Sequence, residues 1–311
     1  MTAPVAQRSE ALPPVAPATA PTVVATARGP LEYVESGEGP AVLCVHGAMG
    51  GHDQSLLLAR TIGEAGYRYV AVSRPGYLGT PLRSGRSADE QADLLAAGLD
   101  ALGIRRAAVM AVSGGGYSAI QLAVRHPDRC TALVLASTIA GIVDTPIPLS
   151  FHLTKRLMRW NWFAEKLRRK VVSDPARAAE RSIRDPALRA RTLADPEAGP
   201  LFRELLVSTL DRPGRRLAGT ENDIAVTRST EYPLERVAAP TLIVHGTADS
   251  VAPYKHARAL AFRIPGAELL SIEDGEHVSI FTHRDLVRAR VSAFLRQHAS
   301  RAAGEGTPRG A

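Results

Sequence analysis

Short apolar runs of strand length alternate with amphipathic helical stretches along most of the chain, and this alternation limits the folds open to it. The strand-like runs in the first part are TVVATA, LEYVES, AVLCV, YVAV, RAAVMAV and TALVLAS. PTLIVHG and AELLSI repeat the pattern near the end, before the helical stretch THRDLVRARVSAFLRQ. Such alternation favours a mostly parallel, doubly wound sheet covered by helices on both faces. We therefore predict an α/β fold.

The alternation is interrupted between residues 144 and 236, where only helical segments are found. Several of these segments open with Asp-Pro or Gly-Pro, which are helix-start signals. The ends of the chain are rich in Ala, Pro and Gly without periodicity, so they cannot bury enough surface to order themselves. The predicted organisation is a disordered N-terminus at 1–21, an α/β core at 22–143 and 237–299, a helical cap inserted at 144–236, and a disordered tail at 300–311.

Charge and cysteine content exclude several classes of protein. The chain has 38 Lys and Arg against 31 Asp and Glu, but most of the basic residues are Arg in a chain rich in Ala and Arg, so the net charge of +7 does not by itself indicate a nucleic-acid partner. No apolar run is long enough to span a membrane. Cys44 and Cys130 are too few for a disulfide framework and lie in or beside apolar runs. The first residues do not read as a secretory signal, so we expect a cytoplasmic protein.

The segment RAAVMAVSGGGYSAIQLAVRHPDR predicts a strand, an abrupt turn at Ser113 and a helix. A turn this tight requires small residues two before and two after its apex, and Ala111 and Gly115 meet that requirement. The apex side chain is then exposed at the carboxyl edge of the sheet. Gly114 starts the helix, and its N–H points to where an oxyanion would form. Taken alone, a glycine-rich turn of this kind also binds phosphates or simply closes a loop.

Two further residues follow later strands in an order that suits nucleophilic catalysis. Asp249 comes after PTLIVHG and His277 comes after AELLSI. The carboxyl ends of parallel strands meet at one edge of a sheet, so both residues can converge on Ser113. His277 would take the proton from Ser113, and Asp249 would hold the imidazole and stabilise its charged form.

The run AVLCVHGAMGG predicts a strand followed by a loop that can present a second backbone N–H to the same oxyanion. We expect this donor to be Ala48, with Met49 as the alternative. His46 in this loop is expected to bond within the loop and not to act as a base.

Together these segments resemble the α/β-hydrolase fold superfamily, in the form of a Ser-His-Asp esterase-like member with a helical cap. The matching elements are the His46-Gly47 loop, SRPGYLGT at 73–80, the elbow AVSGGG, the GTAD loop and the GEH loop. They span about residues 22 to 298. Ala111 replaces the first Gly of the usual Gly-x-Ser-x-Gly elbow, and Ala is still small. The serine at the apex resembles the esterases of this superfamily. It differs from the epoxide hydrolases and haloalkane dehalogenases, which have Asp at that position.

Further polar residues could have a role at the site. His283 is the alternative base. Asn222 and Asp223 are candidates for an alternative acid or a substrate contact, against a helix cap or a surface pair. Three residues after the loop that contains Ala48 could line the entrance to the site, but we expect them to form a solvated loop face. They are His52, Asp53 and Gln54.

The cap carries an excess of positive charge and both tryptophans. Between residues 151 and 194 there are twelve Lys and Arg against four Asp and Glu, and Trp160 and Trp162 lie in the same stretch. A solvated basic face with packed aromatics is the simpler interpretation. The alternatives are an acyl pocket shaped by Trp160 and Trp162, with a charge that attracts an anionic substrate or an acidic carrier protein, or an interfacial membrane helix.

These observations predict a serine hydrolase that cleaves a carboxylic ester of a small molecule through an acyl-enzyme. The same residues would suit a C–C bond, lactone or thioester hydrolase, with a cofactor-free peroxidase-like activity as a side reaction, because this scaffold hosts many reactions. A member of another class would be a binding protein without turnover. No metal-ligand spacing and no phosphate-binding motif occurs, so we expect no metal and no cofactor. We expect no nucleic-acid partner, and a monomer or homodimer.

Overall fold

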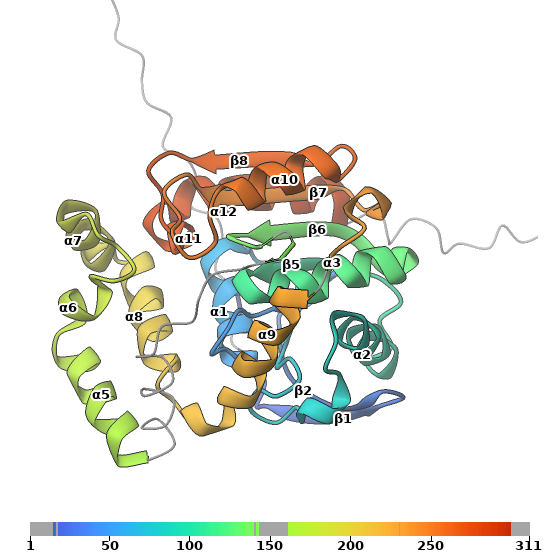
Figure 1. Cartoon of the computed structure of the whole chain (residues 1–311), viewed down its shortest axis with the longest axis horizontal. Coiled ribbons are helices and arrows are strands. Elements are labelled where there is room, and N and C mark those ends of the chain that lie inside the picture. The colour runs from blue at the N-terminus through green and yellow to red at the C-terminus, as the bar shows by residue number, and fades with distance from the viewer. Residues whose placement is uncertain (1–14, 17, 140, 143–160, 230, 300–311) are drawn as a thin grey trace, which may run out of the picture.

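The computed structural model describes residues 15–16, 18–139, 141–142, 161–229 and 231–299. Eight strands in this part of the chain form one sheet (Figure 1). The strands are β1 (Thr22–Thr26), β2 (Gly29–Ser36), β3 (Ala41–Val45), β4 (Arg68–Val72), β5 (Ala107–Val112), β6 (Cys130–Ala136), β7 (Thr241–Gly246) and β8 (Glu268–Ile272). Each of them coincides, within a few residues, with a run that the sequence analysis predicted.

The strand order is β1-β2-β4-β3-β5-β6-β7-β8. β1 and β2 form an antiparallel edge, and the six remaining strands pair in parallel. The prediction of a mostly parallel α/β sheet is therefore confirmed. Ala18 and Thr19 extend the antiparallel edge, because Ala18 bridges to Ser36 and the Thr19 N–H donates to the carbonyl of Glu35. These two residues belong to the segment 1–21 that was predicted to be disordered.

Helices cover both faces of the sheet. The core helices are α1 (His52–Ile62), α2 (Ala88–Ala101), α3 (Gly116–Arg125), α10 (Lys255–Arg263), α11 (Ser279–Thr282) and α12 (Arg284–His298). Alternate residues of the central strands enter two separate apolar cores. On β3, Leu43 belongs to the core shared with α2 and α3, whereas Val42 and Cys44 belong to the core shared with α1 and α12. The central strands are buried on both sides, which explains why they read as continuous apolar runs and not as alternating ones.

The described part of the insertion between β6 and β7 is helical. It contains α5 (Asn161–Ser173), α6 (Pro175–Ala179), α7 (Pro186–Ala194), α8 (Ala198–Ser208) and α9 (Leu217–Ser229). The Asp-Pro signals work as predicted, because Asp174 caps α6 and Asp185 caps α7, with Pro at the first helical position of each. Helices α5 to α8 lie beyond the edge of the sheet to which β6 and β8 point (Figure 1).

Short 3₁₀ turns connect several of these elements. They are Leu82–Ser84, Ser113–Gly115, Pro127–Arg129, Pro213–Arg215 and Leu234–Arg236. Within the described residues, no helix combines the length and the apolar character needed to cross a bilayer. Cys44 and Cys130 are both buried as free thiols, and burial raises the pKa of Cys130 to about 12.

Candidate active site

Ser113 stands at a sharp turn between β5 and α3. Its φ is +51°, a left-handed conformation that costs a non-glycine residue about 1–3 kcal/mol. Gly115 makes the turn possible, because a Cβ at this position would lie 2.6 Å from the carbonyl oxygen of His46 and 2.7 Å from that of Val45. A Cβ at Gly47 would meet the Cβ of Ser113 at 3.0 Å. The elbow and the loop after β3 can therefore approach each other only with glycine at these places.

Three side chains that follow different strands lie in one line at the carboxyl edge of the sheet. The Ser113 Oγ is 3.1 Å from His277 Nε2, and His277 Nδ1 is 2.8 Å from Asp249 Oδ2. Asp249 follows β7 and His277 follows β8, as the sequence analysis expected. The structure thus brings together all three residues that were predicted from their position after a strand.

Asp249 is held as a carboxylate in a fully buried position. Its Oδ1 accepts the backbone N–H groups of Val251 and Ala252, each at 2.8 Å. Burial alone would raise the pKa of Asp249, but hydrogen bonds from His245 and His277 outweigh it and hold the pKa well below its ordinary value. An ionised Asp249 accepts a hydrogen bond from the Nδ1–H of His277, so the ring carries its hydrogen on Nδ1 and Nε2 is left to accept the hydroxyl hydrogen of Ser113.

Two backbone N–H groups lie close together beside Ser113. The nitrogen of Ala48 is 3.4 Å from the point where a Cβ of Gly114 would stand. Among the hydrogen bonds of the described residues, none uses the Ala48 N–H. Met49 was the alternative donor, but its N–H donates to Thr220 Oγ1 at 3.2 Å and is therefore not free. The geometry leaves Ala48 and Gly114 as the pair that could face an oxyanion.

Ser113 and His277 open onto a cavity of about 370 Å³. Its walls are mainly apolar and come from α1, from cap helix α8 and from the segment around α11. The lining residues are Gly47, Ala48, Gln54, Leu57, Leu58, Val112, Ser113, Ser182, Leu205, Leu206, Thr209, Val251, His277, Val278, Ile280 and Phe281. A space of this size and polarity suits a modest, largely apolar acyl group.

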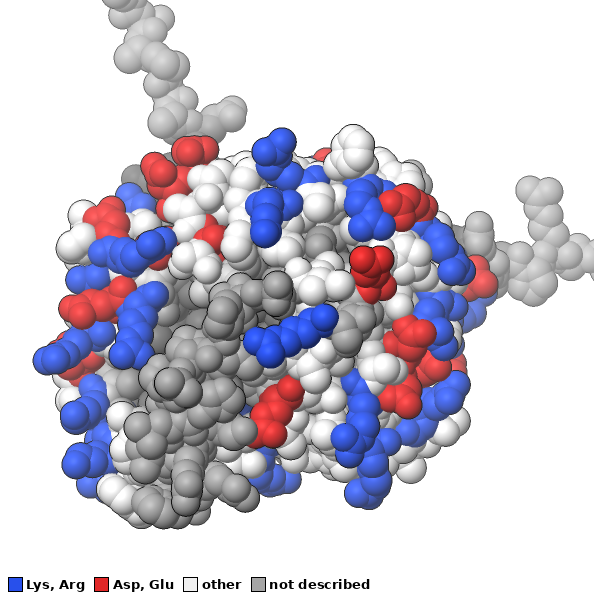
Figure 2. All heavy atoms as spheres, in the orientation of Figure 1, with Lys and Arg blue, Asp and Glu red and all other residues white. Residues whose placement is uncertain are grey.

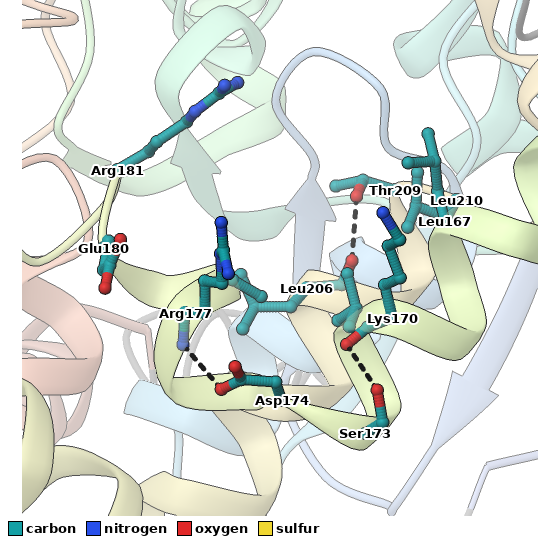
Figure 3. A pocket seen from close by; sticks show the side chains of 12 residues that line it. Leu167, Lys170, Ser173, Asp174, Arg177, Glu180, Arg181, Leu206, Thr209 and Leu210 are labelled. Carbon is teal, nitrogen blue, oxygen red and sulfur yellow. Dashed lines mark hydrogen bonds between the residues drawn. The ribbon is translucent and has the colours of Figure 1, made fainter.

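A second, larger hollow of about 830 Å³ lies on the cap between α5, α6 and α8. Leu206 and Thr209 line both spaces, whereas Ser113 and His277 line only the smaller one, so we assign the chemistry to the smaller one. The side chains of Lys170 and Arg177 project into the larger hollow, above the apolar Leu206 (Figure 3). Basic side chains also predominate along the left edge of the face shown in Figure 2, where Figure 1 places α5 to α7.

Several residues predicted as substrate contacts do not line the cavity. Trp162 is 62% exposed and does not line the cavity, and Trp160 lies outside the described residues. Among the described residues, aliphatic side chains of α8 and Phe281 line the cavity. Asn222 donates to the carbonyl of Arg86. Asp223 is neither a helix cap nor a surface residue, because it is buried in the middle of α9 and pairs with Arg74. A helix cap or a surface position was therefore wrong for Asp223. Its Oδ2 lies 3.2 Å from the point where a Cβ of Gly114 would stand, so it is next to the elbow, and a role of Asn222 or Asp223 at the site stays a prediction.

Three other histidines of the described residues, His46, His52 and His283, are engaged elsewhere. His46 is fully buried: its Nδ1 is 2.6 Å from the carbonyl of Gly47 and its Nε2 accepts the N–H of Arg74. Burial and the charge of Arg74 lower the pKa of His46, so the ring stays neutral. His283 bonds to Thr282 and lines a different surface pocket. His52 is buried against Glu32 and Ser73 and does not lie on a solvated loop face.

Gln54 lines the cavity, which was only the alternative for this residue, whereas the expected solvated loop face was wrong. It is buried in α1, and its amide donates to Ser208 Oγ of the cap at 2.9 Å. Gln54, Leu57 and Leu58 are spaced at i, i+3 and i+4, so they share one face of α1. This helical spacing, in a helix that begins directly after the loop with Ala48, was the signal that could have placed Gln54 in the cavity.

The chain is similar to known proteins along most of its length. Residues 40–284 match the family model described as alpha/beta hydrolase fold. An alpha/beta hydrolase fold protein from Nakamurella multipartita shares 38% of residues with a TM-score of 0.80, over 89% of this chain and 99% of that one.

Two curated relatives carry more specific names. A poly(3-hydroxyalkanoate) depolymerase from Ectopseudomonas oleovorans is 32% identical over 68% of either chain. A pimeloyl-[acyl-carrier protein] methyl ester esterase from Aromatoleum aromaticum is 29% identical over 70% of this chain and 84% of the relative.

Proposed function

Since the chain belongs to the alpha/beta hydrolase fold family, whose curated relatives here are hydrolases, we propose that it is a serine hydrolase that cleaves a carboxylic ester through an acyl-enzyme. The observation that carries this proposal is the line of Ser113, His277 and Asp249, with separations of 3.1 Å and 2.8 Å, at the wall of an apolar cavity. Nucleophile, base and orienting carboxylate are within hydrogen-bond reach of one another, which is the arrangement that activates a neutral hydroxyl.

The proposed reaction has two halves. In the first, the Ser113 Oγ bonds to the ester carbonyl carbon while His277 Nε2 takes the hydroxyl proton, and the resulting oxyanion is held by the N–H groups of Ala48 and Gly114. His277 then gives that proton to the leaving alcohol oxygen, and the acyl group stays on Ser113. In the second half, water attacks the acyl carbon while His277 takes one of its protons. His277 then returns that proton to the Ser113 Oγ as the bond between Oγ and the acyl carbon breaks and the acid leaves.

The cavity sets the expected substrate class. Leu205, Leu206 and Phe281 offer apolar surface, and Gln54 supplies one of the few polar groups. We therefore propose a small-molecule ester with a modest apolar acyl group. We further propose that the protein works in the cytoplasm as a monomer or homodimer, since the buried free thiols of Cys44 and Cys130 suit a reducing compartment.

The test is hydrolysis of a chain-length series of p-nitrophenyl esters, combined with labelling by a fluorophosphonate and intact-mass measurement. Ser113→Ala should abolish both turnover and the single adduct. Ser182→Ala is the matched control, because it removes a hydroxyl from the same cavity but leaves the hydrogen-bonded line intact.

The outcomes distinguish the candidate functions. An adduct at Ser113 without turnover of any ester would contradict ester hydrolysis and direct the search to C–C, lactone or thioester substrates. No adduct on the wild type would overturn the proposal and favour a binding protein.

A further inference from the structure

The loop that carries the Ala48 N–H is hydrogen-bonded to the last helix of the cap insertion, α9, and to the residue just before that helix. We call residues 46–51, between β3 and α1, the oxyanion loop. Thr220 of α9 accepts the N–H of Met49 at 3.2 Å, and Arg216, just before α9, donates to the Met49 carbonyl at 3.4 Å. The Arg216 side chain is fully buried and also pairs with Asp53 at 2.7 Å. Both polar groups of the residue after Ala48 are thus bound by the insertion.

The residues before Ala48 are held by Arg74. Its Nε donates to the carbonyl of His46 at 2.9 Å, and its Nη2 donates to that of Gly47 at 3.2 Å. Asp223 of α9 accepts two hydrogen bonds from the same guanidinium: Nη1 donates to Oδ1 at 2.8 Å, and Nη2 donates to Oδ2 at 2.6 Å. A planar guanidinium with five donors can serve a carboxylate and two carbonyls at once, which an ammonium cannot do with fixed geometry.

Asp223 is fixed in turn by two tyrosines from the core. Tyr77 donates to its Oδ2 at 2.6 Å, and Tyr117 of α3 donates to its Oδ1. The side chains of Arg74 and Asp223 are 1% and 6% exposed, so water does not compete for these bonds. A buried ion pair is weak support for stability, because desolvation offsets most of the attraction. What the network supplies is one geometry for the groups that it binds.

The held groups flank the Ala48 N–H on both sides: the carbonyls of His46 and Gly47 precede it, and both polar groups of Met49 follow it. A peptide N–H that is fixed at both ends has one direction, and an oxyanion donor is effective only when it is aimed before the reaction begins. We infer that helix α9 positions the Ala48 N–H in the oxyanion hole, with Thr220 and Asp223 as its positioning residues. This inference rests on the proposed function.

Met49 provides a second reason to assign α9 this role. Its φ is +56°, an uncommon conformation for a non-glycine residue, and its N–H turns away from the site toward Thr220. Without the Thr220 hydroxyl, the Met49 peptide loses the acceptor that keeps this conformation. The Ala48 peptide, one residue earlier, would then rotate more freely.

The experiment compares Thr220→Val with Thr220→Ser, which restores the hydroxyl. Thr227→Val is the matched control, since the Thr227 hydroxyl donates only to the carbonyls of Asp223 and Ile224 within α9. For each variant we would measure kcat and KM on the best p-nitrophenyl ester, the number of active sites by titration, and Ki for an alkyl trifluoromethyl ketone. This ketone adds the Ser113 Oγ at its carbonyl carbon and places an oxyanion in the hole.

For Thr220→Val we expect about a tenfold fall in both kcat and kcat/KM, with KM and the titrated sites unchanged. The Ki for the ketone should rise by the same factor, and Thr220→Ser should recover most of both losses. Thr227→Val should behave as the wild type. Asp223→Asn, which weakens the grip on Arg74, should give the same pattern with a larger loss, provided that it folds.

Two results would overturn the inference. Wild-type kcat and Ki in Thr220→Val, while the wild-type enzyme turns over esters normally, would refute the role of α9 and leave the proposed function standing. A fall in titrated sites that accounts for the whole loss of rate would show a merely structural role. Absence of ester turnover and of a covalent adduct in the wild type would instead overturn the proposed function, and the inference with it.

Discussion

Replacement of Asp249 by Asn tests the proposed mechanism most directly, because the surroundings dictate how the new amide must sit. The Oδ1 of Asp249 accepts two backbone N–H groups, those of Val251 and Ala252. Asparagine must keep its carbonyl oxygen at this position. Its NH₂ group then occupies the place of Oδ2, which is 2.8 Å from His277 Nδ1. His277 can accept from this amide only as the tautomer with its hydrogen on Nε2, which cannot take the proton from Ser113.

The size of the effect follows from the cost of the opposite tautomer. Placing the hydrogen on Nδ1 would set two buried donors against each other, and each unsatisfied donor costs about 1–3 kcal/mol. The productive tautomer is therefore disfavoured by about 2–6 kcal/mol, which corresponds to roughly 30-fold to 10⁴-fold in rate. The loss of the negative charge that stabilises the imidazolium adds to this cost. We expect kcat to fall by about 10³-fold or more.

The assay is kcat on the best p-nitrophenyl ester at neutral pH, with active sites counted by fluorophosphonate titration. Asp274→Asn is the control, since it makes the same chemical change three residues before His277 on an exposed loop. Asparagine also tolerates the positive φ of +54° at that position. We expect the control to stay within about twofold of the wild type. A loss of less than tenfold for Asp249→Asn would refute the assigned role of Asp249.

Three further predictions concern the cavity, the fold and the cap. Leu206→Ala removes half-buried apolar bulk from the wall of the cavity, so we expect the preferred acyl chain to lengthen in a p-nitrophenyl ester series; an unchanged preference would show that the acyl group binds elsewhere. Burial opposes ionisation of Glu32, but bonds from His52, the Gly79 N–H and Ser73 lower its pKa from 4.5 to about 2. The stability that ionised Glu32 contributes is therefore fully present above pH 4.5 and is lost as the pH falls toward 2, by up to about 3 kcal/mol. Urea unfolding at a series of acid pH values should show a free energy of unfolding that falls less steeply with decreasing pH in Glu32→Gln than in the wild type. Residues 161–194 carry nine Lys and Arg against four Asp and Glu, a net +5, so kcat/KM for an anionic ester should fall with salt more steeply than for a neutral one, and equal slopes would rule out steering by the cap.

The sheet and the three aligned residues were predictable because each depends on local sequence. Apolar runs of strand length mark the strands, and Ser113, Asp249 and His277 each come shortly after one of them. Parallel strands bring such positions to one edge regardless of the residues between them. The small residue at Gly115 was also predictable from the tight turn, although the contact that requires it in the structure is not local, because a Cβ there would meet the carbonyl oxygens of Val45 and His46.

The network behind the oxyanion loop was not predictable by the same means. Arg74 and Asp223 are 149 residues apart, and neither carries a local signal that it will be buried. A charged residue in a polar stretch is ordinarily exposed, and only the way α9 packs on the core reverses this expectation. The position of Trp162 was not predictable either: it is 62% exposed and does not line the cavity, so neither a packed aromatic nor an acyl-pocket role holds for it.

The attachment of α9 to the core limits which part of the insertion can be replaced by that of a relative when substrate specificity is engineered. The insertion runs from β6 to β7 and looks like one replaceable module, yet its last helix is fastened to the core through Arg216, Thr220 and Asp223. A cap graft from a relative that also replaces α9 would bring a foreign surface against residues 46–51. A transplant that stops after α8, and keeps residues 211–229 of the recipient, leaves that surface intact. Chimeras built at the two junctions should therefore differ in turnover number even when they receive the same acyl pocket.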